Sequence, residues 1–188
     1  MKDNSSAGFS YIDVMVALVI MMVGILGLLS ALTAATIQAS GQEQQLNAKQ
    51  YGTSAMESIM SAKETAPKPT DPTPLGWSSV GNVGSNLDSG GVARGVFVTG
   101  VQSVRANAGP DEIIGTVDDA GAVIPGLTRQ IVITDLCDPD RPSAACPTPG
   151  SFPVRNRQVT ITINYFSGTL ARQEVLRTVL TDYATVLN

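Results

Sequence analysis

The sequence predicts an α+β protein in which a long N-terminal helix packs against a C-terminal antiparallel sheet of about four strands. Two observations carry this prediction. Charged residues are absent between Asp13 and Glu43, and no proline occurs between Phe9 and Thr65, so one helix is allowed over the whole stretch. After residue 95, short runs rich in Val, Ile and Thr are separated by turn residues, which is typical of antiparallel strands.

Composition excludes several classes of protein. The chain has 188 residues, and 12 Lys and Arg against 16 Asp and Glu give a net charge of −4. This charge balance argues against a basic surface that binds nucleic acid. Arg155 and Arg157 are too few to form one. There is no histidine, which excludes Ser-His and Cys-His catalysis and imidazole metal sites. No nucleophile motif is recognisable either, so we expect a protein that is not an enzyme.

The uncharged stretch is long enough to cross a membrane. From Val14 to Leu32 nearly every residue is Val, Leu, Ile, Met, Ala or Gly, and about 20 such residues in a helix span the hydrocarbon core. We therefore expect a transmembrane helix over residues 9–42. The alternative is a cleaved secretory signal with Thr33-Ala34-Ala35 as its cleavage site, but such signals have a shorter apolar core behind a basic region.

Beyond residue 43 the helical pattern becomes amphipathic. Within residues 43–65, apolar side chains recur every three or four positions, at Ala48, Tyr51, Ala55, Ile59 and Ala62. Gly52 is a weak point of the helix, because glycine has a low helix propensity. We expect this stripe to pack on the rest of the protein.

Four prolines between residues 67 and 74 end the helix and begin a Pro-, Gly- and Ser-rich loop, which we place at residues 66–94. A head domain is expected at residues 95–188, with strands at 95–105, 128–136, 157–166 and 169–181. In the third strand, alternation puts one set of side chains on a common face: Val159, Ile161, Ile163 and Tyr165. Ser167-Gly168 is expected to turn the chain into the fourth strand.

The residues before the apolar run carry the most specific motif in the chain. A polar leader, residues 1–8, ends in Gly8, and Phe9 and the carboxylate of Asp13 follow. The run Gly8-Phe9-Ser10-Tyr11-Ile12-Asp13-Val14 resembles the cleavage motif of type IV prepilins. The following Val16-Ala17-Leu18-Val19-Ile20 and its Gly-spaced Leu run are most similar to PilV-type minor pilins. The match covers residues 8–32.

The resemblance implies the type IV pilin fold and a route of maturation. A prepilin peptidase would cut between Gly8 and Phe9, and the new amine of Phe9 would be N-methylated. The protein would then be a single-pass inner-membrane protein with a periplasmic C-terminal domain, and later a part of the pilus fibre at the cell surface. Its partners would be the peptidase, other minor and major pilins and the inner-membrane pilus assembly proteins.

Asp13 is the residue that we expect to act in assembly. It lies where pilins usually have Glu, and its side chain is one methylene shorter. An ionised side chain in a membrane helix costs about 2.5–3.5 kcal/mol on insertion scales, so it needs a partner. The resemblance implies the α-amine of a neighbouring subunit. The alternative is that Asp13 marks the membrane edge, with its charge in headgroup water.

Three aspartates lie in the connection after the first expected strand. Asp111, Asp118 and Asp119 belong to a stretch that resembles the calcium loop of the major pseudopilins of type II secretion, although Glu112 stands where that loop has glycine. Oxygen ligands on a flexible loop suit calcium. The alternative is an acidic, solvated connection between strands. No other cofactor is expected.

Three functions remain open from the sequence. The first is a structural minor pilin of the PilV type, which primes pilus assembly or lies at the pilus tip. A minor pseudopilin of a type II secretion system, or a competence pilin, shares the leader and the helix. The third is a single-span, membrane-anchored calcium-binding or adhesive module that does not polymerise, for which substitutions at Asp13 would be silent.

Cys137 and Cys146 are predicted to form a disulfide. They are too far apart for a redox Cys-x-x-Cys pair and too few for a structural zinc site. The alternative is two free thiols in a reducing compartment. Alkylation of the native protein should add mass only after reduction, because a periplasmic head is held in an oxidising environment. Labelling of both cysteines without reduction would contradict the pairing.

Overall fold

A computed structural model of the chain describes residues 10–65, 75–88, 90–136 and 154–182. Contacts divide the chain into two compact units, Met1–Gln42 and Glu43–Asn188. One helix, α1 (Tyr11–Glu64), contributes to both units, and the second unit also contains the short 3-10 helix η1 (Trp77–Ser79). Four strands complete it: β1 (Val101–Asn107), β2 (Ala120–Leu136), β3 (Asn156–Ser167) and β4 (Leu170–Thr181). The predicted α+β fold class is confirmed.

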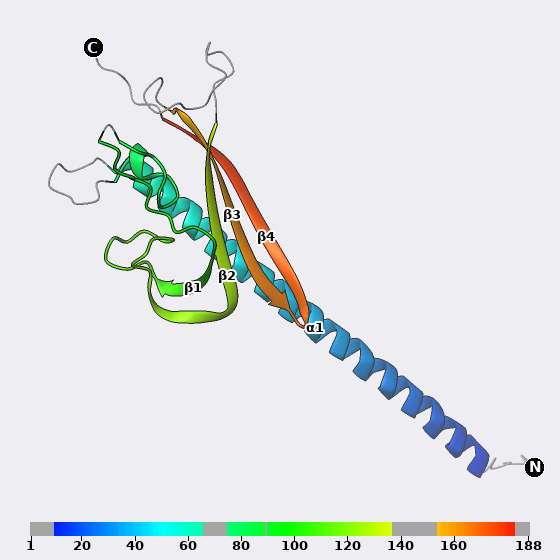
Figure 1. Cartoon of the computed structure of the whole chain (residues 1–188). Coiled ribbons are helices and arrows are strands. Elements are labelled where there is room, and N and C mark those ends of the chain that lie inside the picture. The colour runs from blue at the N-terminus through cyan, green and yellow to red at the C-terminus, as the bar shows by residue number, and fades with distance from the viewer. Residues whose placement is uncertain (1–9, 66–74, 89, 137–153, 183–188) are drawn as a thin grey trace, which may run out of the picture. The chain divides into compact units, whose positions relative to one another are not determined.

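The four strands form one antiparallel sheet in the order β1-β2-β3-β4, so each strand pairs with its neighbour in sequence (Figure 1). Between β3 and β4, Ser167 pairs with Leu170, and Gly168 has a φ of 61°. A positive φ at the first turn position suits glycine and is typical of a type II′ hairpin. The turn residues are therefore Gly168 and Thr169, one position later than predicted.

β2 differs most from the prediction. It begins at Ala120 and not at residue 128, while β1 begins at Val101 and not at residue 95. The added part of β2 contains Pro125 and Gly126, and its pairing with β1 shifts register on both sides of Arg105. Such bulges interrupt the alternation of apolar and polar residues from which strands are predicted.

The core of the second unit lies between α1 and the inner face of β3. Val159, Ile161 and Ile163 are fully buried, and Tyr165 is 6 % exposed. The alternation predicted for this strand is confirmed. Burial of each of these aliphatic side chains contributes about 1.5–3 kcal/mol to folding.

Small residues dominate the face of α1 that packs on this sheet. The buried residues of the helix are Ala48, Gly52, Ala55, Ser58, Ile59 and Ala62. A Cβ on Gly52 would lie 2.8 Å from Cδ1 of Leu176 on β4 and 3.5 Å from Cγ1 of Ile163 on β3. Four of the five predicted stripe positions are buried, while Tyr51 is half-buried at the edge of the core. The absence of side-chain bulk lets the sheet approach the helix backbone closely.

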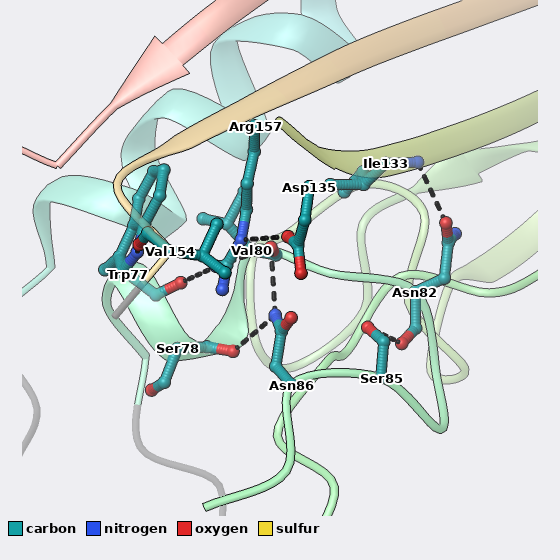
Figure 2. A network of polar contacts seen from close by, with 10 residues as sticks. All are labelled: Trp77, Ser78, Val80, Asn82, Ser85, Asn86, Ile133, Asp135, Val154 and Arg157. Carbon is teal, nitrogen blue, oxygen red and sulfur yellow. Dashed lines mark hydrogen bonds and ion pairs between the residues drawn. The ribbon is translucent and has the colours of Figure 1, made fainter. Parts of the chain in front are cut away.

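A buried arginine fixes η1 and the residue that follows it to the sheet (Figure 2). Arg157, on β3, is 5 % exposed and donates from Nη1 to the carbonyl oxygens of Trp77 and Val80. Its Nε donates to Oδ1 of Asp135 at 2.9 Å, and its guanidinium lies 4.4 Å from the centre of the Trp77 ring. Trp77 Nε1 donates to the carbonyl oxygen of Val154 at 2.7 Å. Burial lowers the pKa of Arg157, which Asp135 opposes; arginine nevertheless stays charged.

The pairing of β1 with β2 begins at Val101 and Gln130. Beyond Gln130, the side chain of Asn82 forms hydrogen bonds with backbone groups at the edge of β2. Its side-chain carboxamide donates to the carbonyl oxygen of Ile131 at 2.9 Å. The same carboxamide accepts from the backbone N–H of Ile133 at 2.9 Å (Figure 2). A residue of a parallel strand bonds its neighbour in the same pattern. The Asn82 side chain thus forms the two hydrogen bonds that a neighbouring strand would otherwise form with the backbone of Ile131 and Ile133.

Gly52→Leu is expected to destabilise the second unit by about 1–3 kcal/mol, because a side chain at this position overlaps Leu176 and must displace that side chain or the sheet that carries it. Thr53→Leu puts the same side chain on the exposed side of α1 and should change stability by less than about 0.5 kcal/mol. Thermal unfolding of the detergent-solubilised full chain measures both. Equal melting temperatures for the two variants would contradict the close helix–sheet contact.

Candidate functional site

The first unit presents an apolar helix surface. Within α1, an 18-residue window with a mean hydropathy of 2.7 has none of its residues buried. Large apolar side chains at more than half exposure include Leu18, Ile20, Met22, Leu26 and Leu28. A continuous exposed apolar surface of this kind marks a site of membrane or protein contact. The helix is long and apolar enough to anchor the chain in a membrane, with the sheet domain outside it.

Asp13 lies in the first turn of α1 and contacts the residue that caps the helix. Its Oδ2 accepts from the backbone N–H of Ser10 at 3.3 Å, and Ser10 Oγ accepts from the backbone N–H of Ile12 at 3.4 Å. The contact from Asp13 is that of a capping box with Asp in place of the usual Glu, but the Ser10 hydroxyl accepts from the second helical residue, Ile12, and not from the third. The Asp13 carboxylate also suits the positive end of the helix dipole. Asp13 therefore has a local structural role, in addition to the role in assembly predicted for it.

Four residues predicted to act in maturation or cross-linking lie outside the described residues: Gly8, Phe9, Cys137 and Cys146. Their roles stay predictions.

Two of the three loop aspartates, Asp111 and Asp118, lie side by side between β1 and β2. Oδ2 of Asp118 accepts from the backbone N–H of Asp111 at 3.2 Å, and its Oδ1 accepts from the hydroxyl of Thr116 at 2.6 Å. Oδ1 of Asp111 accepts from the backbone N–H of Ile113 at 2.8 Å. The Thr116 hydroxyl holds the pKa of Asp118 below its usual value. Partial burial, and then the nearby Asp118 carboxylate, raises the pKa of Asp111.

The third aspartate, Asp119, is committed to different partners. Its two carboxylate oxygens accept from the backbone N–H of Gly115 at 3.0 and 3.1 Å, and its Oδ2 accepts from Nη2 of Arg129 at 2.5 Å. The side chains of Arg129 and Asp119 are 3 % and 12 % exposed. The pair ties the connection between β1 and β2 to the inner face of the sheet.

This arrangement does not bring the three aspartates together as one ligand set. A cationic guanidinium contacts Asp119, and within the described parts of the chain no three Asp, Glu, His or Cys side chains are grouped as metal ligands. Glu112 adopts a φ of 58°, the conformation for which the glycine of the calcium loop would be suited. Calcium binding stays a prediction from the resemblance, and no proposal below depends on it.

Two buried arginines were missed as structural residues from the sequence. From the sequence, Arg157 is expected only as a surface charge, and Arg129 carries no prediction. The available signal was position: Arg129 alternates with Leu127 and Ile131, and Arg157 alternates with Val159, so both lie on the inward-facing rows of their strands.

Comparison of the chain with protein-family models, with curated proteins and with solved structures found no match.

Thr116→Val is expected to lower stability by about 1 kcal/mol near neutral pH, because it removes the hydroxyl that stabilises the ionised form of Asp118. The native pKa of Asp118 lies below its value of 3.8 in the unfolded chain. The stability that this shift contributes is therefore present above that value and is lost as the pH falls through the native pKa. The difference between wild type and variant should shrink on acidification.

Thermal unfolding at a series of pH values measures this effect. Thr160→Val, on the outer row of β3, is the matched control and should show a difference from wild type that does not depend on pH. A Thr116→Val difference of constant size across the acid range would contradict the stabilisation of the Asp118 carboxylate.

Proposed function

We propose that the chain is a structural, non-enzymatic subunit of the type IV pilin class, and that it is a minor pilin of the PilV type. The observation that supports this most is the order of three elements. A prepilin-like motif at Gly8-Phe9 precedes a helix that begins at Tyr11, and that helix is exposed and apolar in the first unit. In the second unit the same helix packs on a four-stranded antiparallel sheet.

Maturation under this proposal converts an inner-membrane precursor into a fibre subunit. Prepilin peptidase removes residues 1–8, and Phe9 becomes the methylated N-terminus. The apolar part of α1 holds the subunit in the inner membrane with the sheet domain in the periplasm. Other minor and major pilins then replace lipid as its neighbours, with the inner-membrane assembly proteins acting on the complex.

The composition of the apolar helix supports association between subunits through helices. Gly24 and Gly27 lie within it, and a Cβ at either position would meet no atom within 4 Å. Ala31 and Ala34 continue the series of small residues. Small residues allow the backbones of neighbouring helices to approach closely in an apolar environment, where packing and not the hydrophobic effect drives association. The apolar half of α1 therefore contributes to assembly as well as to anchoring.

Asp13 supplies the charge in this assembly. After cleavage, the amine of Phe9 on an adjacent subunit is the counter-charge, and pairing offsets the cost of a carboxylate among apolar helices. The capping contact with Ser10 satisfies one backbone N–H but supplies no counter-ion for the carboxylate. A pseudopilin or a competence pilin would use the same chemistry, and neighbouring genes distinguish these systems from a pilus.

Substitutions at Asp13 separate the capping role from the charge. Asp13→Asn keeps an oxygen that can accept from the Ser10 N–H but removes the charge, and Asp13→Glu keeps both. We expect Asp13→Asn to be processed and inserted normally while its co-purification with other pilins falls by about tenfold, the effect of losing roughly 1.4 kcal/mol of subunit pairing. Asp13→Glu should co-purify at least as well as wild type.

Asp13→Ala, which removes both cap and charge, is the reference for complete loss. If Asp13→Asn assembled normally and Asp13→Ala did not, Asp13 would act through helix capping alone. If all three variants assembled as wild type does, the Asp13 charge would have no role in assembly. If wild type itself did not co-purify with other pilins, the chain would be a membrane-anchored module that does not polymerise, and the pilin proposal would fail.

A further inference from the structure

Arg129 occupies a place in the sheet where an apolar side chain is expected. It lies on the inner row of β2 between Leu127 and Ile131, which are 5 % and 3 % exposed, and is itself 3 % exposed. Burying a charge is costly unless the charge is paired and its hydrogen-bonding groups are satisfied. The groups that bind the Arg129 guanidinium therefore determine how its burial is compensated.

Protein partners satisfy only part of the Arg129 guanidinium. Asp119 accepts from its Nη2, and this is the one hydrogen bond of the Arg129 side chain among the described residues. A guanidinium carries five N–H donors in a planar fork. No fully enclosed side-chain nitrogen in the described parts of the chain lacks a partner, so the remaining donors have access to space outside the protein.

That space is an open hollow of about 310 Å³ beside Arg129. Its polar lining comes from β1, from the loop before β2 and from β2, through Gln102, Ser103, Arg105, Thr116, Asp119 and Arg129. Liquid water occupies about 30 Å³ per molecule, so the hollow has room for a small organic acid or for one acidic side chain.

The charges around the hollow select the kind of ligand. Arg105 and Arg129 contribute two positive charges and Asp119 one negative charge, which leaves one positive charge for a ligand to neutralise. A guanidinium binds a carboxylate through two parallel N–H···O bonds. We propose that this hollow binds a carboxylate group, with Arg129 as the primary contact and Arg105 at its rim. The group is carried either by a free small acid or by an acidic side chain of another protein.

The sodium salts of acetate and chloride, compared at equal ionic strength near neutral pH, test the site on the full chain in detergent. At a concentration about ten times its Kd, acetate should raise the melting temperature of wild type by about 3 °C relative to chloride. Arg129→Met, which has a similar apolar length, should lose this shift. Arg177→Met is the matched control, because Arg177 is an exposed residue of β4, and it should keep the shift.

Asp119→Asn provides a second readout of opposite sign. Removal of the competing internal carboxylate should increase the acetate shift, and this variant carries the test if Arg129→Met does not fold. N-acetyl-aspartate amide, compared with N-acetyl-asparagine amide, distinguishes the sources. A shift with the aspartate derivative alone assigns the site to a protein side chain, whereas an equal shift with acetate shows that a free acid suffices.

Two results would overturn the proposal. One is an acetate shift that persists in Arg129→Met, since it would then be a general salt effect. The other is the absence of any carboxylate-specific shift in both wild type and Asp119→Asn, which would mean that the hollow holds solvent alone.

Discussion

Close contact between α1 and the inner face of β3 is the constraint on which the second unit depends. Ala48, Ala55 and Ala62 have little side chain to fill the space, and Gly52 has none, so Ile163 of β3 and Leu176 of β4 lie close to the helix backbone at Gly52. The same unbroken helix presents glycines and alanines in the first unit. Small residues allow close approach to the sheet in the second unit, and under the proposed function they would allow the same approach to other helices in a membrane or fibre.

Two buried arginines stabilise parts of the second unit that lie outside the contact between α1 and the sheet. The connections of the second unit are rich in glycine and polar residues, and bury Val80, Phe97 and Ile113. Arg157 holds η1 and the residue that follows it through backbone carbonyls, and Arg129 holds the connection between β1 and β2 through Asp119. Removing one partner of such a pair leaves a buried charge uncompensated. Polar anchors on the inner row therefore add to the apolar contacts that these loops make with the core through Val80, Phe97 and Ile113.

The parts of the fold that were predictable are those with long, regular patterns. α1, β3 and β4 agree with the sequence-based ranges to within one or two residues over the described parts, because their periodicity is uninterrupted. The start of β2 was wrong because Pro125, Gly126 and the bulged pairing hide a strand. The three loop aspartates could be placed in one connection from the sequence. That Asp119 has other partners than Asp111 and Asp118 could not be predicted, because it depends on Arg129, ten residues along the chain.

The mass of the N-terminal peptide of the protein extracted from membranes tests the central claim most directly. Prepilin processing gives a chain that begins at Phe9 and carries one additional methyl group on its amine. The account predicts that this peptide dominates in cells with the peptidase, and that the unprocessed peptide dominates in cells without it. A chain that retains Met1, or one cut near Thr33-Ala34-Ala35, would contradict membership of the pilin class.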